Sequence, residues 1–231
     1  MPSKNQRNKA NKSKDLLQII ILVTVLVGFI GVIAFAYLSK DSEPVKQAET
    51  QISYEGQPMI GDANAPVKVM EFGDYKCPSC KDFHDSIYPQ LKKDYIDTGK
   101  VQFYFTNYQF LGEDSITAGI GGESVFKQNP SAFWKYYDVV YANQQDKHTE
   151  WATPEFLTDL IKKNIPEVDA EQVKKDMENK TYLKDVEADN EMAVTNNIQR
   201  VPSIVINGKV LENGLDYENI KKVIEEELNQ K

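Results

Sequence analysis

The chain has 231 residues, of which 41% are hydrophobic and 27% are charged, a composition typical of a globular protein with a hydrophobic core. Six basic residues against one acidic residue give residues 1–40 a charge of +5, so the net charge of −8 leaves −13 for the rest. A body this acidic repels phosphate backbones, which argues against nucleic acid as a partner. The two cysteines are too few for a disulfide scaffold and indicate redox chemistry or metal binding instead.

The N-terminal part of the chain predicts a membrane anchor. A polar, basic tail over residues 1–15 precedes residues 16–38, a run of 23 residues without a charge. As a helix this run would be roughly 34 Å long, enough to cross about 30 Å of hydrocarbon. The basic tail stays inside, so the rest of a single-pass protein of the cell membrane lies outside. The alternative is a cleaved signal peptide, because Ala34-Phe35-Ala36 fits a cleavage site, although the run exceeds a signal core of about 7–15 residues.

The next part of the chain predicts a β–α–β unit. Residues 39–58 are polar and contain Pro and Gly, which indicates a linker. Residues 67–72 predict an apolar strand, and apolar residues at four-residue spacing predict a helix over 79–95, with a kink or break at Pro89. Residues 101–105 predict a second strand, which the helical crossover makes parallel to the first.

Residues 111–196 predict an inserted subdomain made only of helices. Thr153 followed by Pro, and Asp169 further on, are typical helix starts, and a further helix is expected over 181–196.

The chain then returns to strands. Residues 203–211 predict a β-hairpin, because Asn207-Gly208 favours a tight two-residue turn, and residues 216–228 predict a closing helix. Residues 59–110 and 197–231 together therefore have the order of a thioredoxin-like α/β domain.

Both cysteines lie where the first strand leads into the first helix. Unpaired N–H groups and the helix dipole favour negative charge at a helix start, so Cys77 is expected to be the low-pKa nucleophile. Pro78 and Ser79 form the dipeptide between the cysteines, and Cys80, one turn into the helix, is expected to be the resolving thiol. The alternative is a pair of thiols that merely pack in the core.

Zinc binding is a second alternative for the cysteines. Cys77, Cys80 and His84 form a partial zinc pattern, but a structural site needs four ligands, and His148 is the only other histidine. We therefore expect no zinc, and we interpret His84 as an ordinary helix residue.

The sequence EFGDYKCPSC at 71–80, Val201-Pro202-Ser203 before a strand, and the helical insertion resemble the DsbA family of thiol:disulfide oxidoreductases in the thioredoxin superfamily. With its N-terminal anchor, the chain is most similar to the membrane-anchored BdbD-type members of Gram-positive bacilli. The resemblance covers about residues 57–231.

This resemblance implies roles for individual residues. Cys77 would be the exposed attacking cysteine and Cys80 its buried partner. Val201-Pro202 would form a cis-proline loop facing the disulfide, where the backbone of Val201 pairs with an extended substrate. Glu71 would be the buried acid beneath the disulfide and would accept the proton of Cys80; its apolar neighbours in the strand favour burial over a solvated strand end.

The resemblance also implies partners and cofactors. The substrates would be reduced exported proteins, a quinone-linked, DsbB-like membrane oxidase would reoxidise the enzyme, and the redox-active disulfide would need no further cofactor. One departure concerns Ser79, because enteric members carry a histidine there, and an imidazolium stabilises a thiolate more than a hydroxyl does.

A run of acidic residues indicates a possible cation site. Asp189, within an acidic run on the helix over 181–196, could bind a hard cation such as structural calcium together with Glu123. The run lacks the glycine of a calcium-binding loop, and a solvated helix face is the simpler interpretation.

The sequence leaves three functions open. The first is an extracytoplasmic oxidoreductase that introduces disulfides into exported proteins through Cys77 and Cys80. The second is a reductase or isomerase on the same fold. The third, of a different class, is a non-catalytic binding domain with a structural disulfide or zinc.

Overall fold

The computed structural model describes residues 52–211 and 213–230. They belong to one compact unit, Glu49–Lys231. The predicted tail over 1–15, the predicted membrane helix over 16–38 and most of the predicted linker over 39–58 lie outside these residues. Within the described part of the chain, no helix is both long and apolar enough to span a bilayer.

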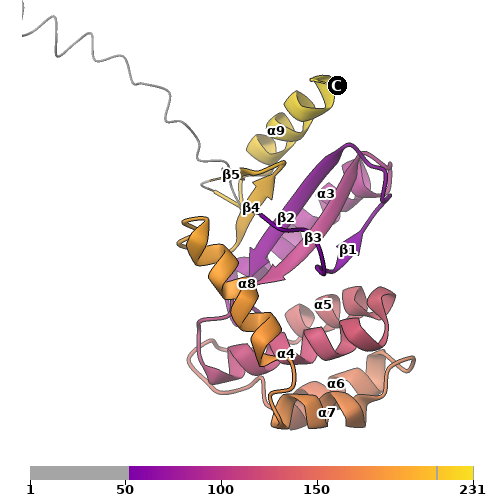
Figure 1. Ribbon diagram of the computed structural model, residues 1–231, viewed down its shortest axis with the longest axis vertical. Coiled ribbons are helices and arrows are strands. Elements are labelled where there is room, and N and C mark those ends of the chain that lie inside the picture. The colour runs from indigo at the N-terminus through magenta and orange to yellow at the C-terminus, as the bar shows by residue number, and fades with distance from the viewer. Residues whose placement is uncertain (1–51, 212, 231) are drawn as a thin grey trace, which may run out of the picture. The chain divides into compact units, whose positions relative to one another are not determined.

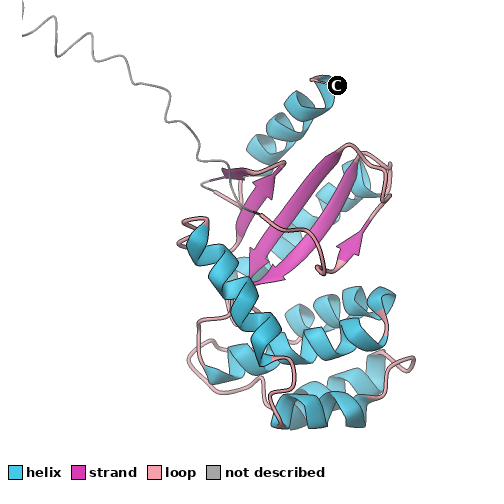
Figure 2. Cartoon of the chain, in the orientation of Figure 1, coloured by secondary structure: helices cyan, strands magenta, loops and turns pink. Residues whose placement is uncertain are grey.

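A five-stranded sheet forms the centre of this unit (Figures 1 and 2). Its spatial order is β1-β3-β2-β4-β5. The strands are β1 (Met59–Ile60), β2 (Val67–Gly73), β3 (Val101–Asn107), β4 (Ser203–Ile206) and β5 (Lys209–Leu211). Strands β2 and β3 pair in parallel, as predicted, while β4 runs antiparallel to β2 and β5 antiparallel to β4.

The predicted hairpin joins β4 and β5. Asn207 and Gly208 both have positive φ angles, of 46° and 84°, which the tight two-residue turn requires. The side chain of Asn207 accepts a hydrogen bond from the backbone N–H of Lys68 at 2.9 Å, so the turn is also fastened to β2.

The first helix is continuous but irregular. It consists of α2 (Pro78–Asp82), the π-helical turn η1 (Phe83–Ile87), α3 (Tyr88–Leu91) and the π-helical turn η2 (Lys92–Ile96). Pro89 does not break it. A proline lacks an N–H and its ring clashes with the carbonyl four residues back, so the irregularity predicted there takes the form of π turns on either side of α3.

The predicted helical insertion is present as a group of helices, most of which lie below the sheet in Figure 1, while the last one rises beside it. It contains α4 (Glu113–Gln128), η3 (Pro130–Ala132), α5 (Phe133–Ala142), α6 (Pro154–Asn164), α7 (Ala170–Glu178) and α8 (Leu183–Thr195). Thr153 and Asp169 cap α6 and α7 through their side-chain oxygens, as predicted. Helix α8 begins at Leu183, two residues later than predicted. The closing helix is α9 (Tyr217–Asn229), capped by Asp216.

Alternation along β2 separates two hydrophobic clusters. Val67 and Val69 point to the face covered by the first helix, α5 and α9, and Met70 and Phe72 point to the face covered by the end of α8. Glu71 follows the parity of Val67 and Val69. The period of two therefore directs this carboxyl group into the layer between the sheet and the cysteine-bearing helix.

The segment before β1 also packs on the sheet. Residues 52–58 fall within the predicted linker, yet the ring of Tyr54 lies 4.8 Å from the ring of Tyr104, and the carbonyl of Pro58 accepts a hydrogen bond from the N–H of Phe105 at 3.2 Å. An aromatic side chain in a mostly polar segment supplies enough apolar surface to dock this end of the linker.

Candidate active site

The two cysteines occupy different environments at the start of α2. Cys77 is the N-cap residue and Pro78 takes the first helical position, where its missing N–H costs nothing. The carbonyl of Cys77 accepts hydrogen bonds from the N–H groups of Cys80 at 3.1 Å and Lys81 at 3.2 Å. Cys77 keeps an exposed fraction of 9%, whereas Cys80 has none. Only Cys77 can therefore meet an attacking thiol from outside.

The pKa values of the two thiols also differ, and the more exposed thiol has the lower one. The pKa of Cys77 is lowered to about 6, chiefly by a hydrogen bond with the Cys80 thiol, and the N–H groups of Cys80 and Ser79 add to this against the opposing effects of burial and of Asp74. The pKa of Cys80 is raised, first by burial and then by its hydrogen bond with Cys77. At neutral pH the reduced pair therefore holds its negative charge on Cys77.

The loop before β4 faces Cys77. Strands β2 and β4 are antiparallel, and Phe72 near the end of β2 lies opposite Ser203 at the start of β4. This register brings Val201 and Pro202 beside the cysteine. The peptide bond between Val201 and Pro202 is cis, and the Cys77 sulfur lies 3.6 Å from the carbonyl oxygen of Val201. Residues 124 positions apart thus meet at the reactive sulfur.

Glu71 is fully buried, as predicted. Its Oε2 accepts a hydrogen bond from the hydroxyl of Tyr137 at 2.7 Å. Burial raises the pKa of Glu71 to about 8; the Tyr137 hydrogen bond and the charge of His84 oppose the rise, and the charge of Cys77 adds to it. The charge of Glu71 in turn raises the pKa of Cys80, which places the two groups within electrostatic reach of each other. A protonated carboxyl group at neutral pH is therefore available near the buried thiol.

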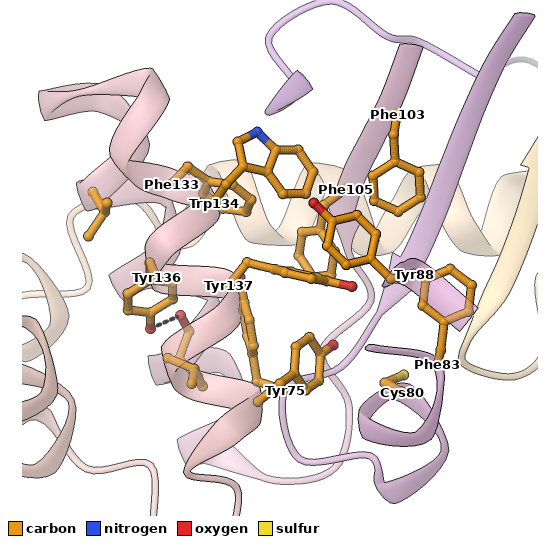
Figure 3. Packing of buried hydrophobic residues seen from close by; sticks show 14 of the residues in the cluster. Tyr75, Cys80, Phe83, Tyr88, Phe103, Phe105, Phe133, Trp134, Tyr136 and Tyr137 are labelled. Atoms are coloured by element: carbon orange, nitrogen blue, oxygen red, sulfur yellow. Dashed lines mark hydrogen bonds between the residues drawn. The ribbon is translucent and has the colours of Figure 1, made fainter. Parts of the chain in front are cut away.

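Aromatic side chains enclose this acid and the buried thiol. Figure 3 shows Cys80 at the edge of a cluster to which the loop residue Tyr75, the strand residue Phe105 and the α5 residue Tyr137 contribute. The ring of Phe105 lies 5.3 Å from that of Tyr75 and 5.4 Å from that of Tyr137. These rings exclude water from the site, which strengthens every electrostatic interaction within it.

Two residues at or just beyond α5 contact the site, and the sequence did not reveal them as such. Tyr137 binds Glu71, and the amide of Gln144 donates hydrogen bonds to the carbonyls of Tyr75 at 2.8 Å and Cys77 at 3.0 Å. Each lies more than 60 residues from the group it contacts, so no local pattern marks either of them. The insertion is therefore part of the active-site wall.

A buried ion pair fastens the cysteine loop to the insertion. The ammonium group of Lys76 lies 2.6 Å from Asp114 and also donates to the carbonyl of Thr149 at 2.9 Å. The second oxygen of Asp114 accepts the N–H groups of Trp151 and Ala152. Each charged group thus has several partners, which a buried ion needs.

His84 does not join the cysteines in a zinc site. Its Nδ1 lies 2.8 Å from Asp85 and its Nε2 lies 3.1 Å from Asp138, so both ring nitrogens face carboxylates. Across the described residues, no three His, Cys, Asp or Glu side chains gather in a way that could hold a metal ion.

The two candidate cation ligands do come together. The amide of Asn107, at the end of β3, donates to Glu123 of α4 and to Asp189 of α8, each at 3.0 Å. The other oxygen of Asp189 accepts a hydrogen bond from Gln57 at 2.6 Å. Glu123 and Asp189 are 4% and 5% exposed, whereas Glu187 is exposed. Asp189 therefore does not belong to a solvated helix face.

Comparisons with known proteins agree with this geometry. The family model described as Thioredoxin matches residues 53–226. A probable disulfide bond formation protein D from Bacillus cereus is 37% identical over 96% of this chain and 100% of its own length. Disulfide bond formation protein D from Bacillus subtilis is 42% identical over 78% of this chain and 81% of its own length.

Solved structures extend the comparison to three dimensions. The crystal structure of oxidised BdbD from Bacillus subtilis superposes with a TM-score of 0.75 over 79% of this chain and 98% of that chain, at 42% identity. The crystal structure of Chlamydia trachomatis DsbA gives a TM-score of 0.70 over 78% of this chain and 95% of that chain, and its 22% identity bears on the fold alone.

The fold and the asymmetric cysteine pair define a thioredoxin-like, DsbA-type dithiol–disulfide oxidoreductase. Within that class, the chain belongs to the family of the Bacillus disulfide bond formation proteins D.

Proposed function

We propose that this enzyme introduces disulfide bonds into exported proteins through Cys77 and Cys80. The asymmetry of the two thiols carries the proposal, because Cys77 combines partial exposure with a pKa of about 6 and Cys80 is fully buried with a raised pKa. A low-pKa thiolate stabilises the reduced enzyme, by about 30 mV for each pKa unit in a two-electron couple. A stable reduced form makes the disulfide an oxidant.

The reaction then proceeds in two exchanges. A substrate thiolate attacks the sulfur of Cys77, the bond to Cys80 breaks, and Cys80 leaves with the electron pair. Glu71, neutral below about pH 8, gives its proton to the Cys80 thiolate. A second substrate thiolate then attacks the substrate sulfur of the mixed disulfide and releases Cys77 as a stable thiolate. The substrate is oxidised by two electrons as its disulfide forms, and the enzyme, reduced by the same two electrons, ends with a Cys77 thiolate and a Cys80 thiol.

The backbone of Val201 would position the substrate. Its carbonyl lies at the Cys77 sulfur, where an extended substrate strand can pair with the loop. Pro202 has no backbone N–H, so it cannot compete with a substrate strand for hydrogen bonds in this loop.

Two measurements test the function and its direction. A Cys77→Ser variant should lose all oxidation of a reduced dithiol peptide, whereas a Cys80→Ser variant should still form a mixed disulfide. The redox potential decides the direction, because a value near the −270 mV of thioredoxin would favour the reductase alternative over the oxidase.

We further propose that residues 16–38 anchor the enzyme in the membrane, and that a quinone-linked, DsbB-like oxidase removes its electrons. The charge-free run supports the anchor, and the match to the Bacillus cereus relative extends over 96% of this chain. Carbonate extraction of membranes, with protease added to intact protoplasts, tests the anchor and its orientation. Accumulation of reduced enzyme in cells depleted of quinone tests the electron acceptor.

We also propose a structural calcium site at Glu123 and Asp189. Two buried carboxylates share Asn107, and burial together with the charge of Asp189 raises the pKa of Glu123 to about 8. The Oε1 atom of Gln57 is buried and has no hydrogen-bond partner among the described residues. These oxygens are of the kind that a hard cation binds. Calcium should raise the melting temperature of the protein, and Asp189→Asn should abolish that rise.

A further inference from the structure

His84 is held between two carboxylates on the helix that carries the cysteines. It lies one helical turn after Cys80, and its side chain is 14% exposed. Its Nδ1 lies 2.8 Å from a carboxylate oxygen of Asp85, and its Nε2 lies 3.1 Å from one of Asp138 on α5. Ionised carboxylates only accept hydrogen bonds, so both contacts are hydrogen bonds only when both ring nitrogens carry protons. The hydrogen-bond geometry therefore assigns a positively charged imidazolium.

This imidazolium lies one aromatic ring away from the buried acid. The imidazole ring is 5.3 Å from the ring of Tyr137 and 5.4 Å from that of Tyr141, and both tyrosines are fully buried. The hydroxyl of Tyr137 is the group that binds Glu71. The space between the cation and the carboxyl group is thus filled by aromatic side chains rather than by water, and the charge is weakly screened there.

The remaining charges around His84 also favour the protonated imidazole. Burial lowers the pKa of His84, but the hydrogen bonds and charges of Asp138 and Asp85 raise it by more. Lys81 neutralises part of this effect, because its ammonium group lies 2.8 Å from Asp85. The other titratable groups packed against the imidazole are the hydroxyls of Tyr88, Tyr137 and Tyr141, whose pKa values are all raised, so that they stay neutral.

We infer that His84 is a positioning residue whose fixed positive charge controls the protonation state of Glu71 and, through it, proton exchange at Cys80. The inference rests on the proposed role of Glu71 in the oxidoreductase reaction. It gives the site a cation that the dipeptide Pro78-Ser79 does not supply. The charge lies one helical turn after Cys80 instead of between the two cysteines.

The test measures the step in which Cys80 acts. Reduced enzyme is mixed with glutathione disulfide, Cys77 forms a mixed disulfide with glutathione, and Cys80 then displaces glutathione. Acid quenching followed by mass spectrometry gives the rate of this displacement between pH 5 and 9. In His84→Gln the loss of the cation should move the midpoint of the pH profile upward, by about 0.5–1 pH unit for a charge acting across one aromatic ring.

A charge-conserving variant serves as the matched control. His84→Lys should keep the midpoint of the unsubstituted enzyme, because an ammonium group can still lie between Asp85 and Asp138. An unchanged midpoint in His84→Gln, or an equal shift in both variants, would overturn the inference. Circular dichroism and the melting temperature check that both variants fold.

Two further measurements keep this inference separate from the proposed function. If Glu71→Gln leaves the profile unchanged, Glu71 is not the proton carrier, and the proposed function loses that step. If Glu71→Gln changes the profile and His84→Gln does not, only the role of His84 falls. Nitrogen chemical shifts of His84 in the unsubstituted protein give an answer that needs no variant, since a neutral imidazole at pH 7 contradicts the assignment.

Discussion

At the scale of single residues, one helical turn separates two thiols with opposite properties. Cys77 lies at the helix cap, where N–H groups and the neighbouring thiol stabilise its negative charge, and Cys80 lies inside the aromatic cluster, where burial opposes charge. The chemistry of the pair depends on this difference. A disulfide between two equivalent thiols would have no preferred point of attack.

The hydrogen bond between the two thiols leads to the first prediction. Because the Cys80 thiol is the largest cause of the lowered pKa of Cys77, Cys80→Ala should raise the pKa of Cys77 above about 6. The absorbance of the thiolate at about 240 nm, followed during a pH titration, measures this. In the control variant Cys77→Ala, thiolate should appear only in the alkaline range, since burial raises the pKa of Cys80. Equal titrations in Cys80→Ala and the unsubstituted protein would refute this account.

The buried acid leads to the second prediction, which concerns stability and pH. Glu71 has a pKa of about 8 in the folded protein against an ordinary value of 4.5, so between these values the unfolded chain binds fewer protons. Stability therefore falls as the pH rises through this window, by up to about 1.4 kcal/mol per pH unit. Glu71→Gln keeps the shape but not the charge and should remove this fall. Urea unfolding at pH 5 and pH 7.5 measures the difference, and parallel profiles would contradict it.

At the scale of elements, the cysteine loop is held by the insertion as much as by the sheet. Lys76 precedes Cys77 directly and is 2% exposed, and its charge is balanced by Asp114 on α4. Gln144, just beyond α5, fixes two carbonyls of the same loop. The sheet determines where the loop starts, and the helices determine the shape it takes.

The buried ion pair leads to the third prediction. Asp114→Ala leaves the ammonium group of Lys76 buried without its counter-ion and should destabilise the protein by about 3–5 kcal/mol. Adding Lys76→Met should recover part of that loss, because the uncompensated charge is removed. Lys162→Met at an exposed pair with Glu171 is the matched control, with an expected cost below about 1 kcal/mol. Chemical denaturation of the three variants and the unsubstituted protein measures these costs, and a small effect of Asp114→Ala would contradict the prediction.

At the scale of the whole molecule, the helical insertion and the thioredoxin-like sheet form one structure around the reactive sulfur. The sheet supplies Glu71 and the loop before β4, and α5 supplies Tyr137 and Asp138. We therefore expect that reducing or oxidising the Cys77–Cys80 bond changes the free energy of unfolding of the whole folded unit.

This coupling gives the fourth prediction. Reduction creates a Cys77 thiolate that the fold stabilises, while a disulfide across two intervening residues restricts the unfolded chain very little. At pH 7.5 the reduced protein should therefore melt at a higher temperature than the oxidised protein. Because the pKa of Cys77 is lowered, this advantage is lost as the pH falls through about 6, is already partly present at pH 7.5, and grows up to the ordinary thiol pKa. Calorimetry of both forms checks it, and an oxidised form that melts higher at pH 7.5 would exclude it.

The local parts of this protein could be predicted from the sequence because their causes are local. Strand β2 follows from its apolar run, the caps at Thr153 and Asp169 from their side-chain oxygens, and the hairpin turn from Asn207-Gly208. The position of Cys77 at a helix start needed only the strand before it and the proline after it. The resemblance to DsbA-type proteins added the pairing of this site with Val201-Pro202, which no local pattern contains.

Only the tertiary structure decided how strongly each group holds its proton. The pKa of Glu71 depends first on burial, which its apolar neighbours in the strand indicated, and then on Tyr137 and His84, which no sequence spacing links to it. His84 was interpreted as an ordinary helix residue, since its partner Asp138 lies 54 residues away on another helix. The physical reason is that a local conformation depends on neighbouring residues, whereas charge and solvation depend on whatever the folded chain brings within a few ångströms.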